Sequence, residues 1–289
     1  MTVRRVVVIA AVALVACVAV ACAVALTRPT AQRTMSPVPI VNPTEVGRVG
    51  APHRPLSSAQ IAVLPEARYD AVIAGLMAST DSPVDTAYSI RADAPIYGAD
   101  LTTPVGRFSA RNFLGEPTVV VPVETRGEWA RVLTPARKAL PSRSDGNAPA
   151  QTAGWIRADV LVDPMPLPRR IVVSVAAETL AIVAGHTIEQ TFRVGVGASS
   201  TPTPQGVTGY LQARYLDPAQ NQTRHPVQLT SLHSSAADDP LEGGDGGLIG
   251  VHYERTATGA VSHGCIRLSA AAIEAVNALP LGTSISIVG

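Results

Sequence analysis

From Asp85 to the C-terminus, short runs of aliphatic, aromatic and β-branched residues alternate with turn residues. Runs of about four to eight such residues, bounded by Gly, Pro, Asn, Asp or Ser, are typical of strands. The chain has 289 residues, which corresponds to about two domains of ordinary size. We therefore predict a mostly β protein with more than one folded part.

The first group of strands is predicted within residues 84–164, at Thr86–Arg91, Thr118–Val123, Ala130–Leu133 and Gly154–Ala158. In this segment, Trp129-Ala-Arg-Val132 and Gly154-Trp155-Ile156 resemble motifs of the bacterial SH3-like barrel, in which such aromatic residues pack the small barrel. The resemblance implies a small β-barrel that binds wall polymer or a peptide, or a spacer that orients the next domain. The sequence leaves these roles open.

A Pro-rich stretch, Pro164-Met-Pro-Leu-Pro168, predicts a boundary, after which residues 169–289 form a second β domain. Its one predicted helix is Ser269–Leu279, which Ser269 can cap and Pro280 ends. Its predicted strands are Arg170–Val175, Thr179–Ala184, Thr187–Val194, Thr208–Tyr215, Val227–Leu232, Ile249–His252 and Ser284–Val288, with a hairpin turn at Gly185. We expect a mostly antiparallel domain with one late helix.

The N-terminus carries a long apolar run, Val6–Leu26, without charge, Pro or Gly, directly after Arg4 and Arg5. As a helix the run is about 31 Å long, close to the ~30 Å hydrocarbon core of a bilayer. The preceding positive charges predict a cytoplasmic N-terminus and export of the rest. Residues 1–26 are thus predicted as an uncleaved signal anchor in the cytoplasmic membrane. The alternatives are a signal peptide cleaved near Ala19–Ala21 and a lipoprotein signal at Leu14–Cys17.

Two stretches of different composition separate the anchor from the first β domain. Residues 27–56 are rich in Pro and predict an extended, semi-rigid linker. Residues 57–83 predict a short helical segment, because one helix can begin at Ser57 and Glu66–Ala78 has apolar residues at helical spacing. We expect Glu66–Ala78 to be an amphipathic helix packed on its neighbour.

Charge and cysteine content narrow the function classes. Lys and Arg number 23 against 22 Asp and Glu, so no basic excess indicates nucleic-acid binding and no acidic excess indicates a solvating tail. The three cysteines, Cys17, Cys22 and Cys265, are too few for a disulfide scaffold or a four-cysteine zinc site. Cys265 is the only thiol of the exported part, so it is either buried or a reactive thiol.

Candidate partners for a reactive Cys265 lie close to it in the sequence. A thiol attacks as the thiolate, and an unperturbed cysteine has a pKa of about 8.5, so it needs a nearby imidazole or cation. His252 and His263 both come shortly before Cys265, and Arg267 shares its face in an extended segment. Gly264 permits a tight turn before the thiol, and the positive end of the predicted late helix would assist the thiolate.

These residues have other interpretations. A single cysteine is often a small buried hydrophobe, and a lone histidine is often structural. A zinc site of His252, His263 and Cys265 is conceivable, but no second cysteine or carboxylate lies at ligand spacing, so no metal is predicted. A papain-like protease has its cysteine early and its histidine far downstream, which is the opposite chain order.

Two motifs resemble the L,D-transpeptidase catalytic domain. Ser262-His263-Gly264-Cys265-Ile266-Arg267, with Ile249-Gly250-Val251-His252 upstream, is similar to its active-site signature. Thr203-Pro204-Gln205-Gly206 is similar to its Thr-Pro-x-Gly turn. The resemblance covers residues 169–289, and it implies a β-sandwich or barrel catalytic domain that requires no metal or other cofactor.

The resemblance also implies a role for each matching residue. Cys265 is the nucleophile, and His252 is the proton donor and acceptor that forms the thiolate and later activates the incoming amine. Ser262, His263 and Gly264 shape the active-site turn, and backbone N–H groups near Gly264 and Cys265 would stabilise the oxyanion.

Substrate contacts are implied for Ser262, Arg267 and Tyr253. Arg267 would hold a carboxylate or brace the loop. Tyr253 stands where family members commonly have Gly, and its bulk would narrow the donor site. An acidic, glycine-rich loop precedes His252, with the alternatives of a solvated loop or a lid over the peptide amine; its carboxylates are Asp238, Asp239, Glu242 and Asp245.

The implied enzyme is a cysteine-dependent acyltransferase of peptidoglycan. Cys265 would form a thioester with the third stem residue, release D-alanine and pass the acyl group to another stem's amine, giving a 3→3 cross-link. The resemblance also implies inhibition by carbapenem-type β-lactams. The alternatives are an L,D-carboxypeptidase, a ligase that joins a protein to the wall, and a wall-binding protein without catalysis.

Overall fold

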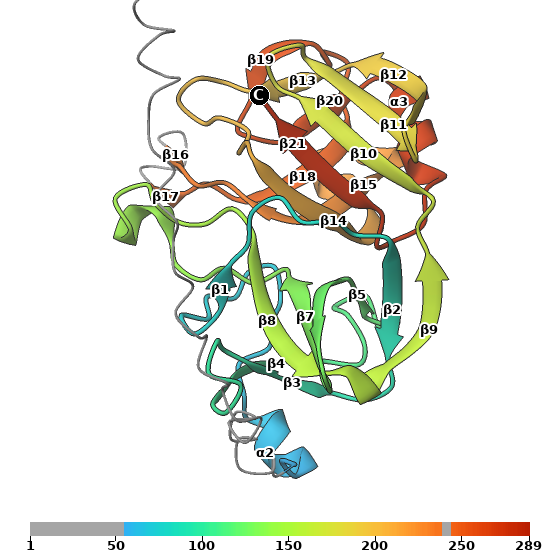
Figure 1. The fold of residues 1–289 in the computed structure, drawn as a ribbon. Coiled ribbons are helices and arrows are strands. Elements are labelled where there is room, and N and C mark those ends of the chain that lie inside the picture. Colours follow the sequence, from blue (N-terminus) through green and yellow to red (C-terminus); the bar gives the residue numbers. More distant parts are fainter. Residues whose placement is uncertain (1–54, 239–243) are drawn as a thin grey trace, which may run out of the picture. The chain divides into compact units, whose positions relative to one another are not determined.

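The computed structural model of the protein describes residues 55–238 and 244–289 (Figure 1). The predicted anchor at Val6–Leu26 and the predicted linker up to residue 54 lie outside the described residues. Every helix within the described residues is too short or too polar to cross a membrane. The described residues belong to one compact unit, residues 53–289.

The first half of this unit is built from two small antiparallel sheets (Figure 1). One has the order β4-β3-β8-β7-β6, with β1 paired to β8, and the other has the order β5-β2-β9. The strands are β1 (Met77–Ala78), β2 (Thr86–Ile90), β3 (Ala94–Tyr97), β4 (Pro104–Phe108), β5 (Val119–Val120), β6 (Pro122–Arg126), β7 (Trp129–Thr134), β8 (Thr152–Arg157) and β9 (Leu161–Pro166). The SH3-like identity of this half stays a prediction.

The predicted helix over Glu66–Ala78 is wrong. The structure has one short helix in this region, α2 (Ser58–Ala62), capped by Ser57. In the following segment, long-range backbone bonds replace helical ones: Ala67 N–H donates to Arg107 O at 2.8 Å, and Ile73 N–H donates to Arg137 O at 2.8 Å. The apolar spacing therefore reflects an irregular segment that buries Ile73 in the β core.

The predicted Pro-rich boundary begins inside a strand. Pro164 and Pro166 lie in β9, which pairs with β2 at one edge of its sheet. An edge strand can contain Pro because the N–H groups on its outer side form no hydrogen bonds to another strand. The chain then passes through Leu167, which is buried, into the second half.

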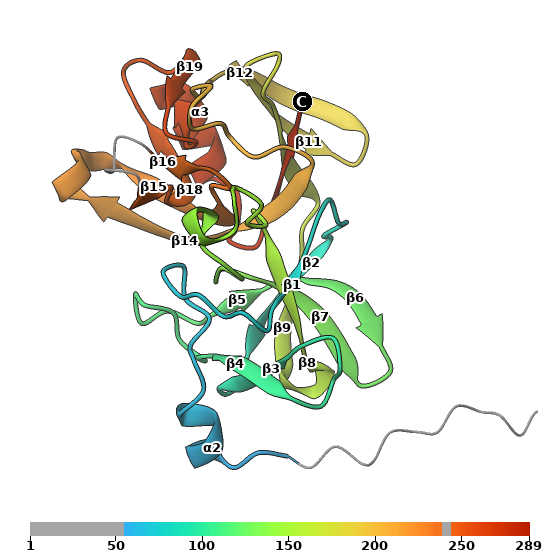
Figure 2. The same ribbon diagram turned by 90° about the vertical axis from the view of Figure 1, so that its left-hand side faces the viewer.

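A ten-stranded sheet forms the second half, in the order β12-β11-β10-β21-β14-β15-β18-β20-β13-β19 (Figures 1 and 2). Most neighbours are antiparallel, but three pairs are parallel: β10 with β21, β18 with β20, and β13 with β19. The strands are β10 (Arg169–Ser174), β11 (Thr179–Ala184), β12 (Thr187–Arg193), β13 (Gly195–Gly197), β14 (Val207–Asp217), β15 (Gln222–His233), β18 (Leu248–Tyr253), β19 (Gly259–Ser262), β20 (Ile266–Leu268) and β21 (Ser284–Val288). A separate pair, β16 (Ala237–Asp238) and β17 (Gly244–Asp245), flanks residues 239–243. Short 3₁₀ turns lie at Pro141–Arg143, Ala158–Val160 and Pro218–Gln220.

The predicted late helix is confirmed as α3 (Ala270–Asn277). Ser269 Oγ caps it by accepting from Ala272 N–H at 3.4 Å. The helix buries Ile273 and Val276 in the same aliphatic core that covers β18 and β20. Helix α3 therefore braces the two strands that carry the candidate catalytic residues.

Buried polar contacts join the two halves. Gln151 is fully buried, and its Oε1 accepts from Ser231 Oγ of β15 at 2.6 Å. His233 Nε2 lies 2.7 Å from Pro135 O, and burial together with the nearby Arg137 guanidinium lowers the pKa of His233 to about 3. A neutral imidazole is therefore part of this junction at physiological pH.

Part of the predicted acidic loop belongs to this junction. Asp245 accepts hydrogen bonds from Ser142 N–H at 2.6 Å and from Ser142 Oγ at 2.9 Å. The buried Arg137 guanidinium donates to the Ser234 and Gly246 carbonyls. Asp245 therefore holds the first half to the loop before β18, while residues 239–243 of the predicted loop lie outside the described residues.

Candidate active site

The thiol of Cys265 lies against the backbone of β18. Gly250 N–H donates to Cys265 Sγ at 3.4 Å, and a Cβ added to Gly250 would lie 3.7 Å from Sγ. Sγ also lies 3.8 Å from the Leu248 carbonyl oxygen. The thiol therefore lies beside a backbone N–H donor, which stabilises a thiolate.

The parallel pairing of β18 and β20 brings the predicted residues to one face. His252 pairs with Arg267 in the strand register. His252 is two residues after Gly250, and Arg267 is two residues after Cys265, so their side chains point to the same side of the sheet as Sγ. The structure therefore places the side chains of Cys265, His252 and Arg267 on one side of β18 and β20.

The turn that presents Cys265 is closed by Ser262. Ser262 is buried, its Oγ donates to Cys265 O at 2.6 Å, and Gly264 N–H donates to Ser262 Oγ at 3.2 Å. Gly264 has φ +105°, and a Cβ there would lie 3.0 Å from Ile249 Cδ1. Glycine is required here because other residues disfavour this φ and the core leaves no space for a side chain.

A second turn, which contains Thr201 and Thr203, supports the turn that presents Cys265. Thr203 Oγ1 accepts from Gly197 N–H at 2.9 Å and donates to Gly264 O at 2.8 Å. Thr201 Oγ1 donates to Ser262 O at 3.2 Å. Thr203 of the Thr-Pro-x-Gly sequence therefore holds the Gly264 carbonyl, and Thr201, two residues before that sequence, holds the Ser262 carbonyl.

One carbonyl oxygen orients the candidate base. His252 Nδ1 lies 3.1 Å from Tyr253 O, and Gln222 Nε2 donates to the same oxygen at 2.9 Å. With Nδ1–H directed at this oxygen, Nε2 carries the lone pair that accepts a proton. Gln222 is buried, and sequence analysis missed it because no spacing signal links it to a histidine in a different strand.

The Tyr253 ring packs beside the ring of His225. Its centroid lies 4.9 Å from that of His225, with the two rings tilted by 45°. The ring also packs against the aliphatic core of the second half. Packing of this kind holds the Tyr253 peptide group, and with it the oxygen that faces His252.

Burial favours the uncharged forms of both reacting groups. It raises the pKa of the Cys265 thiol, which the Gly250 N–H and the Arg267 cation only partly offset. Burial also lowers the pKa of His252, against the opposing effect of the Tyr253 carbonyl. Both shifts favour a neutral thiol and a neutral imidazole, so an attack by Sγ would require transfer of its proton.

We expect the rate of Cys265 acylation to fall at low pH with a midpoint below pH 6.5, the ordinary histidine value. The reason is that protonated His252 cannot accept the thiol proton, and burial keeps His252 neutral to lower pH than usual. The rate of covalent adduct formation, followed by intact-protein mass spectrometry across pH, measures this midpoint. A midpoint above pH 7 would contradict the neutral pair.

His263 lies exposed in the turn before Gly264, and Arg267 is half-buried. Arg267 Nε is buried and finds no hydrogen-bond partner among the described residues. Residues 55–238 and 244–289 hold no group of three His, Cys, Asp or Glu side chains arranged to bind a metal ion. Histidine, thiol and guanidinium thus form a site suited to acyl transfer.

Comparison with known proteins gives a family match for the part of the chain that contains this site. Residues 168–287 match the family model YkuD, the L,D-transpeptidase catalytic domain. The match contains β10–β20, α3 and almost all of β21, and so the whole candidate site. A search of the curated proteins finds no relative of the chain.

Several solved structures are similar to parts of the chain. The avibactam carbamoyl enzyme of Ldtfm is 16% identical over 42% of this chain and 49% of that chain, with a TM-score of 0.29. An L,D-transpeptidase from Stackebrandtia nassauensis is 15% identical over 42% and 56%, with a TM-score of 0.30. An L,D-transpeptidase from Mycobacterium tuberculosis is 12% identical over 75% and 98%, with a TM-score of 0.36. The chain spans about half the length of the first two.

Proposed function

Since residues 168–287 form a domain of the L,D-transpeptidase catalytic family, we propose that the protein is a peptidoglycan L,D-transpeptidase with Cys265 as its nucleophile. The observation that carries the proposal is the position of Sγ beside the Gly250 N–H, on the same face as His252 and Arg267. A thiol, a base and a cation on one face are the groups that acyl transfer from a peptide carbonyl requires.

In the first step, Sγ attacks the carbonyl carbon of the third stem residue, an L-centre of meso-diaminopimelate or an equivalent. His252 Nε2 takes the thiol proton and passes it to the leaving nitrogen of D-alanine, so a C–S bond forms as the C–N bond breaks. The Gly264 N–H already donates to Ser262 Oγ, so we assign the developing oxyanion to the Cys265 N–H.

In the second step, a side-chain amine from another stem attacks the thioester carbon. Nε2 accepts a proton from the amine and returns it to sulfur as the C–S bond breaks, which forms the 3→3 cross-link. Arg267, whose Nε has no partner among the described residues, is the group we assign to a substrate carboxylate. The bulk of Tyr253 would narrow the donor site, and His263 would shape the turn before Cys265.

To test this proposal, the protein and its Cys265→Ala variant are each incubated with purified disaccharide-tetrapeptide, and the products are identified by mass spectrometry. A dimer that lacks one D-alanine is the expected result. Tripeptide monomer alone would replace the transpeptidase with an L,D-carboxypeptidase, because water would then resolve the thioester. No product that depends on Cys265 would overturn the enzyme assignment.

The place of action follows from the substrate and the N-terminal sequence. Arg4 and Arg5 followed by the uncharged Val6–Leu26 support export across the cytoplasmic membrane, with the helix kept as an anchor. We propose that the catalytic domain faces the cell wall and that carbapenem-type β-lactams acylate Cys265. Alkaline extraction of membranes measures the first point, since an anchored protein stays with the lipid.

A further inference from the structure

A loop of the first half contacts the segment that leads into β18, the strand that faces the Cys265 thiol. This loop, residues 135–151, connects β7 to β8 and is called the β7–β8 loop. Its Arg137 side chain is buried, with 7% of its surface exposed. A guanidinium loses its hydration on burial, so a buried one is retained where its N–H groups find acceptors.

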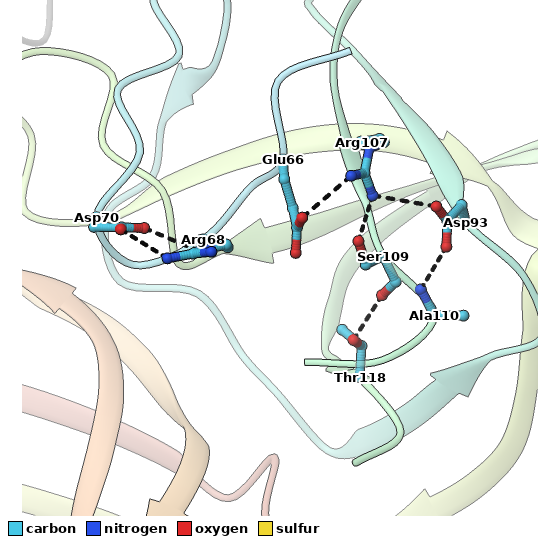
Figure 3. Close-up of polar contacts among 8 residues, drawn as sticks. All are labelled: Glu66, Arg68, Asp70, Asp93, Arg107, Ser109, Ala110 and Thr118. Atoms are coloured by element: carbon cyan, nitrogen blue, oxygen red, sulfur yellow. Dashed lines mark hydrogen bonds and ion pairs between the residues drawn. The ribbon is translucent and has the colours of Figure 1, made fainter. Parts of the chain in front are cut away.

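The backbone of Arg137 is held inside the first half. Arg137 N–H donates to Ala71 O at 2.8 Å, and Ile73 N–H donates to Arg137 O at 2.8 Å. The segment that carries these two partners is tied to β4, because Glu66 pairs with Arg107 at 3.2 Å (Figure 3). The guanidinium therefore extends from a backbone that the first half holds on both sides.

The Arg137 guanidinium joins two segments of the second half at the base of the β16–β17 pair. It donates to Ser234 O, just after β15, at 3.5 Å and to Gly246 O, shortly before β18. The two segments lie so close that a Cβ added to Gly246 would lie 2.6 Å from Ser234 Oγ. One side chain of the first half thus bridges the end of β15 and the approach to β18.

Other contacts of the β7–β8 loop hold the same two segments. Ser142 N–H and Oγ donate to the Asp245 carboxylate at 2.6 and 2.9 Å. His233 N–H donates to Ala150 O at 2.8 Å, and His233 Nε2 lies 2.7 Å from Pro135 O. The loop therefore holds the end of β15 through His233 and the approach to β18 through Asp245.

The start of β18 needs such support because its pairing with β15 is irregular. The register shifts between Leu229 and His233, which separates the His233–Leu248 pair from the Leu229–Gly250 pair. These residues of β18 face the thiol: Leu248 O lies 3.8 Å from Cys265 Sγ, and Gly250 N–H donates to Sγ at 3.4 Å. A hydrogen bond weakens steeply as its angle changes, so a shift of this strand weakens the donor that stabilises the thiolate.

We propose that Arg137 is a positioning residue for the nucleophile. Its bridge at the base of the β16–β17 pair holds the start of β18 in place, and with it the Gly250 N–H beside Cys265 Sγ. Arg137 acts through β18 and does not touch the reacting atoms. The first half thus orients the catalytic residues, independently of any ligand that it binds. The proposal rests on the proposed function, in which Cys265 is the nucleophile.

Alkylation of Cys265 by iodoacetamide across pH, in the full chain in detergent, tests the proposal. Peptide mass spectrometry follows Cys265 alone, because Cys17 and Cys22 also carry thiols. Arg137→Met keeps a long side chain without its donors. In this variant we expect the pH midpoint of alkylation to rise by about one unit and the rate below the midpoint to fall about tenfold. The kcat of D-alanine release should fall about tenfold while KM changes little.

Three further variants separate the bridge from charge and from loss of fold. Arg137→Lys keeps the charge, but one ammonium cannot replace two guanidinium nitrogens, so alkylation should slow about threefold or more. Asp245→Ala removes both bonds to Ser142 and keeps the buried guanidinium, and it should slow alkylation about threefold. Arg143→Met is the matched control, because Arg143 is an exposed arginine of the same loop, and it should react as the wild type does. Rates are compared at a temperature at which thermal unfolding shows every variant to be folded.

Two results would overturn the proposal. One is a wild-type alkylation rate and midpoint in folded Arg137→Met or in Arg137→Lys; in the second case charge alone would be sufficient. The other is equal slowing by Arg143→Met. If Arg137→Met does not fold, Arg137→Lys and Asp245→Ala decide by the same criterion. Because alkylation of the thiol requires no acyl transfer, the bridge can be tested even if transpeptidation fails, and the reverse.

Discussion

The Cys265→Ala variant is expected to lose at least about 10⁴-fold in turnover and to form no covalent adduct with a carbapenem. In the proposed mechanism Sγ forms the bond to the substrate carbon, and its Gly250 N–H partner has no role without it. The loss should therefore appear in the chemical step. D-alanine release and intact-protein mass spectrometry measure the two effects.

The control for this variant is Cys265→Ser, which places a hydroxyl oxygen at nearly the position of the sulfur atom. A serine hydroxyl is a far weaker acid than a thiol, so the serine variant should also be inactive although its shape is kept. Both variants should unfold at nearly the wild-type temperature, because the Cys265 side chain is only half-buried. Turnover by Cys265→Ala within tenfold of the wild type would contradict the nucleophile assignment.

The Gly264→Ala variant is expected to lose about 100-fold or more in the rate of Cys265 acylation without any change of reacting group. Alanine at φ +105° is strained, and its Cβ would lie 3.0 Å from Ile249 Cδ1 in the core. Relief of the strained φ would move the turn, and Sγ would move with it relative to Gly250. The same strain should lower the free energy of unfolding by about 1–3 kcal/mol.

The matched control is Gly247→Ala, one residue before β18. A Cβ added to Gly247 has no atom within 4 Å, so this substitution should change neither acylation nor stability measurably. Thermal unfolding and the rate of adduct formation, measured for both variants, separate the two glycines. Equal behaviour of Gly264→Ala and Gly247→Ala would show that the turn tolerates displacement.

The predictions for Cys265→Ala and Gly264→Ala depend on different contacts of the turn that presents Cys265. Ser262 closes the turn, and Thr203 holds the Gly264 carbonyl from the neighbouring loop. Gln222 acts on the other partner, since it donates to the oxygen that faces His252 Nδ1. The proposed nucleophile and the proposed base are thus each held by a buried polar side chain from a distant part of the sequence.

Local sequence predicted most of the regular structure of the catalytic half. Alternating apolar runs with turn residues predicted β10–β12 closely, because each strand of this hairpin pair lies next to its neighbour in sequence. The late helix was predicted for the same reason: Ser269 caps it and Pro280 ends it locally. Short strands such as β13 and β20 were missed, since so few residues carry too little pattern.

The error over Glu66–Ala78 has a different cause. Apolar spacing there is compatible with a helix, but the backbone groups bond to Arg107 and Arg137, which are far along the chain. Such pairing appears only when the rest of the first half has folded around it. Local pattern has no information about a bond whose partner lies in a distant strand or loop.

From the sequence alone, the residue types around Cys265 left a buried cysteine, structural histidines and a zinc site open, and the prediction of thiol acyl transfer came from the resemblance of Ser262–Arg267 to a family signature. The sequence by itself determined the strands and helix whose signals are local. Only the tertiary structure decided that His252 and Arg267 share a face with Sγ, because that depends on the β18–β20 register. The contacts of Gln222 and Thr203 likewise join distant segments, and packing, not spacing, brings such segments together.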